Sequence, residues 1–301
     1  MYNTYEETIK ELCLRDERYV VVTAENRALI RNLPSVLGPR FIDVGITEQN
    51  MIGMASGLAL RGRKPVVHAL ATFLTLRAFE FIRTDVGIGK LPVKITSFVP
   101  GFLSDANGPT HQAIEDVSLM RGIPGMEVYC PANNEDMCLM LETIWGTEAP
   151  TYLRANTRPA PAAYQHKPFE IGKAEVISEG SDITILTYGM LFENCLLAKA
   201  ILEKQGLSVG LVNLRSLKPI DENLLLSLAK GPSRLVTVED HFHVGGLNSI
   251  LAELFQKHRL APLVQNIDLG DKWFKPALLG EVLEYEGFTP EKLAARITNF
   301  Q

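Results

Sequence analysis

The stretch FIDVGITEQNMIGMASGLAL, residues 41–60, decides how the rest of the chain is interpreted. After Thr47, apolar residues recur with the spacing of one inward-facing helix face. They are Met51, Ile52, Met54, Ala55, Leu58 and Ala59. Thr47 is a typical N-cap residue, because its hydroxyl can accept a hydrogen bond from a free backbone N–H of the first turn. Glu48 follows in that turn, where the helix dipole favours a carboxylate by about 0.3–1 kcal/mol. Because this is the ordinary reason for an acid at such a place, a chemical role for Glu48 needs support from the rest of the chain.

The length and composition are typical of a two-domain globular protein. With 301 residues and 46% hydrophobic content, the chain is long enough for two domains with a core each. Its 30 basic and 35 acidic residues are interspersed and give a formal net charge of -5, which argues against a nucleic-acid surface. The four cysteines lack metal-ligand spacing such as CxxC. Since no apolar run reaches membrane-spanning length and no apolar signal segment leads the chain, we expect a cytoplasmic protein that binds no membrane.

Short apolar runs alternate with helical patterns along the whole chain. In the first half the expected strands are 18–25, 40–45, 64–70, 91–99, 126–132 and 150–156, and the expected helices are 4–16, 47–60, 74–89, 113–120 and 133–145. In the second half the expected strands are 182–189 and 234–241, residues 207–221 are expected to form a strand and a turn, and the expected helices are 193–205, 222–230 and 245–258. Such alternation predicts an α/β fold with parallel sheets and right-handed crossovers.

A proline-rich stretch separates the two halves. Residues 156–170, NTRPAPAAYQHKPFE, hold three prolines and show no regular period, which is typical of a linker. We therefore predict a first domain at 1–155, a linker at 156–175 and a second domain at 176–301.

Three segments with chemical potential follow strands of the first domain. Glu48 follows the strand at 40–45, the segment ALATFLTLRAF (69–79) ends the third strand, and SDANGPTHQ (104–112) follows the fourth. In an open α/β sheet, ligands bind beyond the carboxyl ends of the strands. One edge of the sheet is therefore expected to carry a carboxylate, an aromatic cluster and a histidine.

Each of these residues also has a structural interpretation. His111 and Gln112 follow a Gly-Pro turn, so His111 lies either on a plain surface turn or at a cleft. Phe73 and Phe79, with Leu76 between them at three-residue spacing, pack by default into the core. A wall against a flat heteroaromatic ring is the less common role for such phenylalanines.

Taken together, the motifs match one family. The order DVGITEQN (43–50), ATF (71–73) and GPTHQ (108–112) resembles the pyrimidine-binding half of transketolases and of 1-deoxyxylulose-5-phosphate synthases, which use thiamine diphosphate. Further segments resemble the same family, the last two of them its C-terminal domain. They are RTDVGIGKLPV (83–93), IPGMEVYCPANNEDM (123–137), VNLRSLKPID (212–221) and VEDHFHVGGLNSIL (238–251). The resemblance implies a pyrimidine-binding domain followed by a transketolase C-terminal domain.

The resemblance assigns cofactor contacts to three residues. It implies that the carboxyl of Glu48 bonds the aminopyrimidine ring nitrogen opposite the exocyclic amine, which favours the tautomer that takes the thiazolium proton. Burial beside an apolar ring suits this role because it favours the neutral carboxyl. Phe73 matches an aromatic wall of the pyrimidine. Transketolases usually carry a second aromatic where this chain has Leu76, so Phe79 stays a candidate for stacking.

Substrate contacts follow from the same resemblance. His111 matches the histidine that contacts donor-sugar oxygens near the reacting carbon, and Arg154 matches an arginine that binds the far phosphate of the sugar. Asn107 stands where transketolases carry an aspartate that binds a substrate hydroxyl. The segment SFVPGF (97–102) is apolar where the family usually has a phosphate-binding histidine or arginine. The far end of the substrate is therefore predicted to be another anion, a deoxy carbon or an uncharged group.

One part of the family pattern is absent from this sequence. Transketolases hold the diphosphate through a divalent metal on a preceding domain with a GDG…N motif, and these 301 residues contain no such motif. Because Met1 leads directly into a capped helix, we expect a naturally split enzyme. A separate N-terminal subunit would supply Mg2+ and the diphosphate site, in an α2β2 assembly by analogy with the family.

Four functions are compatible with the sequence. The favoured one is a split transketolase that moves a two-carbon ketol unit between sugars, which we expect to be anionic. The beta subunit of a 2-oxo-acid dehydrogenase shares the layout and the EQ pair but lacks GPTHQ. A synthase that makes a deoxy or branched sugar from pyruvate is the third. The fourth, a non-catalytic regulatory subunit, fits poorly because both Glu48 and His111 are present.

Overall fold

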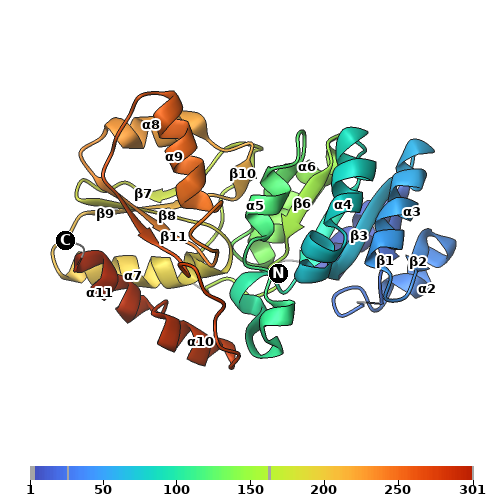
Figure 1. The fold of residues 1–301 in the computed structure, drawn as a ribbon, viewed down its shortest axis with the longest axis horizontal. Helices are drawn as coiled ribbons and strands as arrows, with labels where there is room; N and C mark the ends of the chain where they lie inside the picture. The colour runs from blue at the N-terminus through green and yellow to red at the C-terminus, as the bar shows by residue number, and fades with distance from the viewer. Residues whose placement is uncertain (1–3, 26, 162–163, 300–301) are drawn as a thin grey trace.

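The computed structural model describes residues 4–25, 27–161 and 164–299. These residues form two sheets, each flanked by helices, that lie side by side (Figure 1). The first sheet has seven strands in the order β10-β5-β6-β4-β3-β1-β2, and the second has five in the order β12-β11-β8-β9-β7. The strands are β1 (Tyr19–Thr23), β2 (Phe41–Asp43), β3 (Lys64–Leu70), β4 (Lys94–Phe98), β5 (Glu127–Tyr129), β6 (Thr151–Arg154), β7 (Glu175–Ser178), β8 (Ile183–Thr187), β9 (Val209–Asn213), β10 (Ser216–Lys218), β11 (Arg234–Val238) and β12 (Val264–Ile267).

Helices cover both faces of both sheets. They are α1 (Tyr5–Arg15), α2 (Leu33–Leu37), α3 (Glu48–Leu60), α4 (Phe79–Phe81), α5 (Asp116–Arg121), α6 (Asn134–Gly146), α7 (Phe192–Lys204), α8 (Glu222–Lys230), α9 (Leu247–Lys257), α10 (Leu279–Glu286) and α11 (Pro290–Thr298). In the second domain, α8 and α9 cover one face of the sheet while α7 and α11 cover the other (Figure 1). None of the helices in the described ranges combines the length and the apolar content needed to span a membrane.

The predicted α/β class with two parallel-sheet domains is confirmed, with two exceptions in strand direction. Strand β1 (YVVVT) is buried along its whole length, which is why it reads as a nearly continuous apolar run. Strand β4 (KITSF) is equally buried although three of its residues are polar. Two pairs are antiparallel, β7 with β9 and β10 with β5. The sheets are therefore mostly rather than wholly parallel.

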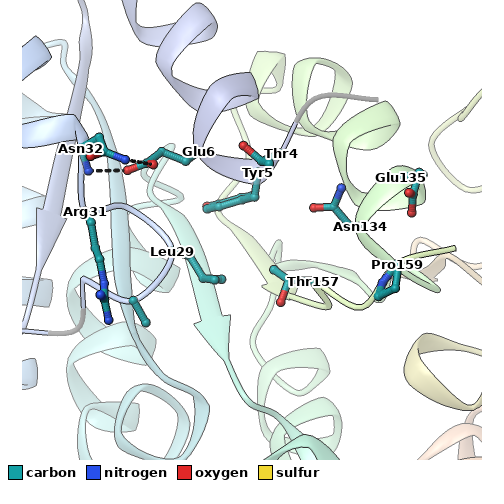
Figure 2. Close-up of a pocket in the computed structure, with 11 residues that line it drawn as sticks. Thr4, Tyr5, Glu6, Leu29, Arg31, Asn32, Asn134, Glu135, Thr157 and Pro159 are labelled. Carbon is teal, nitrogen blue, oxygen red and sulfur yellow. Dashed lines mark hydrogen bonds between the residues drawn. The ribbon is translucent and has the colours of Figure 1, made fainter. Parts of the chain in front are cut away.

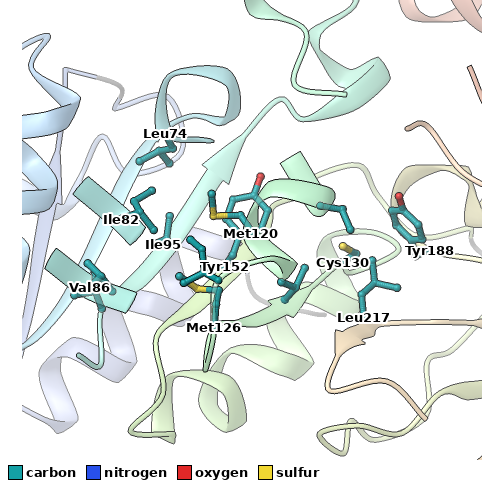
Figure 3. Packing of buried hydrophobic residues seen from close by; sticks show 14 of the residues in the cluster. Leu74, Ile82, Val86, Ile95, Met120, Met126, Cys130, Tyr152, Tyr188 and Leu217 are labelled. Carbon is teal, nitrogen blue, oxygen red and sulfur yellow. The ribbon is translucent and has the colours of Figure 1, made fainter. Parts of the chain in front are cut away.

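Strand β10 joins the two domains. It follows β9 in the chain, yet it forms the edge of the first sheet beside β5, and the Lys218 ammonium donates hydrogen bonds to the carbonyls of Arg121 and Ile123. The apolar core is continuous across the same boundary, from Tyr152 of the first domain to Leu217 of the second (Figure 3). The two halves therefore share one apolar cluster in addition to the clusters that lie mainly within each half. The boundaries 1–155, 156–175 and 176–301 stay a prediction.

The helix expected at 74–89 differs from the prediction. The chain instead forms a π-helix at Phe73–Arg77, the short α4, and a second π-helix at Ile82–Ile88. Wide π turns in place of α turns change which side chains share a face, and such turns are frequent at functional sites.

The expected cap of α3 is also different. Thr47 does occupy the N-cap position, but its side chain makes no capping hydrogen bond to the helix. Its hydroxyl donates instead to the Val44 carbonyl at 3.0 Å. The hydroxyl therefore stabilises the turn between β2 and α3, which fixes where Glu48 begins the helix.

A buried histidine in β3 makes the stability of this fold sensitive to pH. Nε2 of His68 lies 2.7 Å from the Tyr5 hydroxyl, which links β3 to α1. Burial lowers the pKa of His68 from 6.5 to about 3. Between these two values the unfolded chain binds a proton that the folded chain does not, so the stability present above pH 6.5 is lost as the pH falls towards 3.

We expect His68→Gln to weaken this dependence on pH. The loss of unfolding free energy between pH 7 and pH 5 should be about 2 kcal/mol smaller in the variant than in the wild type. Urea unfolding at both pH values measures it, and His258→Gln, at an exposed position, is the control. Equal losses in the wild type and in His68→Gln would contradict the prediction.

Candidate active site

A pocket of about 320 Å³ opens at the carboxyl ends of β1, β2 and β3. It is lined by Ala24, Glu25, Ile46, Glu48, Ala69, Leu70 and Phe73. Glu48 is 2% exposed, and most of the residues that line the pocket beside it are apolar. The structure thus brings two residues named from the sequence, Glu48 and Phe73, into one pocket at the sheet edge where ligands of α/β folds bind.

Arg77 is a site residue that the sequence motifs did not indicate. Its Nη1 donates a 3.0 Å hydrogen bond to Oε2 of Glu48, and its guanidinium carbon lies 4.2 Å from the centre of the Phe73 ring. The signal available in the sequence was the four-residue spacing from Phe73 to Arg77, which lets both side chains meet on one side of a helix.

His111 lies against the same aromatic ring. It ends the short 3-10 helix Pro109–His111, and its ring centre is 5.1 Å from that of Phe73 in an edge-on arrangement. The Thr110 hydroxyl lies 2.9 Å from Nδ1 of His111. Nε2 is therefore the ring nitrogen available to a ligand. Asn107 is exposed on the preceding 3-10 segment, Gly101–Asn107, of the same loop.

Phe79 does not join this group. It is partly buried and packs against the core that α3 and the sheet share, and it does not line the pocket. The π turns between Phe73 and Phe79 place the two rings in different surroundings. The structure therefore places Phe79 against the core and outside the pocket, and its contact with a cofactor stays a prediction.

Arg154 also lies apart from the expected position of a phosphate ligand. Its side chain is 2% exposed, and Nε donates to Asp116 at 2.9 Å. Nη1 donates to the Asp240 carboxylate at 2.5 Å, and Nη2 donates to the Asp240 carbonyl at 3.2 Å. Since all three nitrogens are engaged by buried acceptors, the geometry does not support a contact between Arg154 and a substrate anion.

The electrostatics of Arg154 agree with this placement. Burial disfavours the charged guanidinium, but Asp116 and Asp240 outweigh burial and raise the pKa of Arg154 well above its usual range. Burial raises the pKa of Asp240, and Arg154 opposes that shift. The group is a buried ion-pair triad that joins the first domain to the second.

A second buried charged cluster could in principle ligate a metal. The side chains of Asp136, His166 and Glu175 each offer one ligand atom, and these atoms lie within 4.8 Å of one another. However, Arg215 donates to Asp136 at 3.2 Å and Asn213 donates to Glu175 at 3.0 Å. Because Arg215 already supplies the positive charge, we interpret this cluster as a set of buried ion pairs and hydrogen bonds that connects the linker to both domains.

Another hollow, of about 420 Å³, lies between the start of α1, residues 28–32 and the start of α6 (Figure 2). Two carboxylates line it. Glu6 accepts hydrogen bonds from the backbone and side-chain nitrogens of Asn32 at 2.6 and 2.7 Å, and Glu135 accepts one from the backbone N–H of Ala160 at 2.7 Å. None of the residues expected at the active site lines it. The pocket beside Glu48 is therefore the candidate active site.

Comparison with known families covers both domains. Residues 1–161 match the model of the transketolase pyrimidine-binding domain, and residues 172–293 match the model of the transketolase C-terminal domain. A 6-deoxy-6-sulfo-D-fructose transketolase subunit from Clostridium sp. (strain MSTE9) is 33% identical over 97% of this chain and 91% of its own length.

Two further relatives bear on the domain arrangement. A 1-deoxy-D-xylulose-5-phosphate synthase from Prochlorococcus marinus is 32% identical over 97% of this chain, which spans 46% of that enzyme. A solved structure described as a split gene transketolase, an inactive beta4 tetramer, has 32% identity and a TM-score of 0.86 over 98% of this chain and 95% of its own. The chain thus corresponds to nearly a whole subunit in split proteins and to about half of the synthase.

The geometry of Arg154 leads to a prediction about stability. Arg154→Met leaves Asp116 and Asp240 buried without a counter-charge, so the free energy of unfolding should fall by about 3–5 kcal/mol. Arg158→Met is the matched control. It removes a half-buried arginine with one 3.5 Å contact to Glu193, and should cost less than about 1 kcal/mol. Urea unfolding measures both. If Arg154→Met is as stable as the wild type, the structural role of Arg154 is wrong and the substrate contact expected from the sequence becomes the better interpretation.

Proposed function

The chain belongs to the transketolase family, and we propose that it is the pyrimidine-binding subunit of a split, thiamine-diphosphate-dependent transketolase. In this proposal it transfers a two-carbon ketol unit between sugars together with a separate chain. The observation that carries the proposal is that Glu48 and Phe73 line one pocket at the carboxyl edge of the first sheet, with His111 packed against the Phe73 ring. These are the residues that the family motifs single out.

The pocket suits the aminopyrimidine ring of the cofactor. Apolar side chains and the Phe73 ring form its walls, and one buried carboxyl, that of Glu48, faces it. When bound, thiamine diphosphate supplies the carbon nucleophile that adds to a ketose carbonyl. Glu48 would hold a proton at the ring nitrogen, which requires that Arg77 release or share the carboxylate, and Phe73 would pack against the ring.

His111 would act on the sugar. With Nδ1 next to the Thr110 hydroxyl, Nε2 can hydrogen-bond the substrate oxygens beside the reacting carbon. Asn107 would bind a hydroxyl further along the sugar from the same loop. Its amide can both donate and accept hydrogen bonds, but it lacks the charge of the aspartate usual in transketolases.

A partner subunit would complete the site. The sequence lacks the GDG…N motif, so we assign Mg2+ and the diphosphate to a transketolase N-terminal subunit, in an α2β2 assembly. Apolar side chains are exposed at the pocket and on the helices beside it, which supports coverage by another chain. They are Ile46 (66% exposed), Leu76 (43%) and Phe81 (37%).

We propose an anionic sugar as substrate. A second pocket, of about 200 Å³, adjoins the first through Leu70 and is apolar apart from Thr157 and Arg158. Because Arg154 is engaged by carboxylates, Arg158 is the cation placed to contact an anion at the far end of the sugar. The name of the Clostridium relative, a sulfosugar transketolase subunit, supports an anion of this kind on a deoxy carbon.

A second candidate is a synthase that uses pyruvate as donor. The similarity to 1-deoxy-D-xylulose-5-phosphate synthase, which covers the chain almost completely, favours it over the beta subunit of a 2-oxo-acid dehydrogenase. The donor separates a transketolase from a synthase. Turnover of a ketose donor supports transketolase chemistry, and turnover that needs pyruvate as the donor together with an aldehyde acceptor supports the synthase.

Proton exchange on the cofactor tests the role of Glu48. We expect this chain plus a partner carrying the GDG…N motif to exchange the thiazolium C–H in deuterated buffer, and neither chain to do so alone. Glu48→Gln should slow the exchange about 10²–10⁴-fold, because the amide cannot relay the proton. His111→Asn should keep the exchange rate but lose sugar turnover. Wild-type exchange in Glu48→Gln would disprove the assignment of Glu48.

Substrate charge tests the role of Arg158. Arg158→Met should raise KM for a sugar phosphate or sulfonate about tenfold, with little change in kcat and no effect on the uncharged sugar. Arg61→Met removes an exposed arginine at the end of α3 and serves as the control. If the wild type does not prefer the anionic sugar and Arg158→Met changes nothing, the substrate is an uncharged sugar.

A further inference from the structure

The loop that carries Asn107 and His111 has a strained backbone. Val99, just after β4, has φ 47, and Asp105 has φ 25. Positive φ is unfavourable for a non-glycine residue, above all for a β-branched one such as Val99. Such conformations persist only where the surrounding structure imposes them, so the contacts that hold this loop need to be identified.

The first contact is made by Asp240, which follows β11 of the second domain. Its Oδ2 accepts a 3.1 Å hydrogen bond from the backbone N–H of Phe102, while its Oδ1 is bonded to Arg154. Gly101 permits this approach, because a Cβ there would lie 1.9 Å from Oδ2 of Asp240. Its φ of 55 also favours glycine.

The second contact is made by the segment that follows β12. The Phe102 ring packs edge-on against Phe274 and Phe288, at 5.2 and 5.0 Å between ring centres. At the other end of the loop, Nε2 of Gln112 donates to the Phe274 carbonyl at 2.8 Å. A Cβ on Gly108 would lie 3.5 Å from Pro276, so the same segment also lines the middle of the loop.

We propose that Asp240 is a positioning residue for substrate binding. The C-terminal domain would fix the loop at Phe102 through Asp240 and at Gln112 through Phe274, and so set where His111 meets the sugar. Glu48 lies on α3 and is not part of this arrangement. Loss of the Asp240 contact should therefore impair sugar binding and leave proton exchange on the cofactor unaffected.

Amide hydrogen exchange of the full chain tests the inference without reference to activity. In Asp240→Asn, the peptide covering residues 101–112 should exchange faster than in the wild type, while peptides from β3 and α3 keep their rates. Glu253→Gln is the matched control, since it removes a carboxylate that pairs with Arg121 across the same domain boundary without touching the loop. Gln112→Met, which loses only the bond to Phe274, should give the same local effect even if Asp240→Asn fails to fold.

Kinetics of the assembled enzyme supply the second readout, which rests on the proposed function. Asp240→Asn and Gln112→Met should lower kcat/KM for the donor sugar about tenfold to a hundredfold, because small displacements of positioned groups are costly. Exchange of the cofactor C–H should stay at the wild-type rate. If turnover and cofactor exchange fall together, or if neither changes, Asp240 has no positioning role.

The two readouts also separate failure of this inference from failure of the proposed function. If the wild-type complex shows no exchange on thiamine diphosphate, the proposed function is wrong, and amide exchange still decides whether Asp240 holds the loop. If the wild-type complex is active but residues 101–112 exchange equally in all variants, the positioning role is wrong and the function stands.

Discussion

The contact between the two domains depends on the buried ion pairs of Arg154 with Asp116 and Asp240. One buried guanidinium faces two buried carboxylates, Asp116 from the first domain and Asp240 from the second. Removing charges from water costs several kcal/mol for each ion, so the three groups are tolerable only together. The Tyr152 hydroxyl donates to Asp116 at 2.7 Å, and the backbone of Phe102 donates to Asp240. The triad therefore fixes the relative placement of the two domains and, through Phe102, one end of the loop that carries His111.

Local sequence patterns predicted some parts of this structure and missed others, depending on how far apart in the chain the contacting residues lie. Strands such as β1 and β3 were predictable because both faces of a parallel sheet are buried, which leaves mostly apolar runs. The proximity of Glu48, Phe73 and His111 was predictable because their motifs follow neighbouring strands, whereas their roles stay a prediction. The partners of Arg154 lie 38 and 86 residues away, and no local pattern reports a contact at that separation. The family resemblance suggested a substrate contact for Arg154, but it could not indicate that the side chain points toward Asp116 and Asp240.

The remaining errors have similar physical causes. Strand β10 is three residues long and pairs with a sheet of the other domain, so neither its length nor its neighbours in the sequence predict it. The π-helix at Phe73–Arg77 keeps the apolar content of an α-helix and differs from it in its hydrogen-bond ladder and its wider turn, which composition does not report. Phe79 packs against the core, while Arg77 reaches Glu48.

The contact between Arg77 and Glu48 follows from the same constraint that governs Arg154. A carboxylate that is 2% exposed needs a partner, and Arg77 provides one from the mouth of the pocket, where its side chain is 42% exposed. An arginine that is partly in water can leave at little cost, because it regains hydration when the contact breaks. Arg154, which is 2% exposed, has no such compensation. The chain thus has two arginine–carboxylate contacts of opposite character. The buried contact joins the two domains and is costly to break, whereas the contact beside the pocket is open to water and can break at little cost.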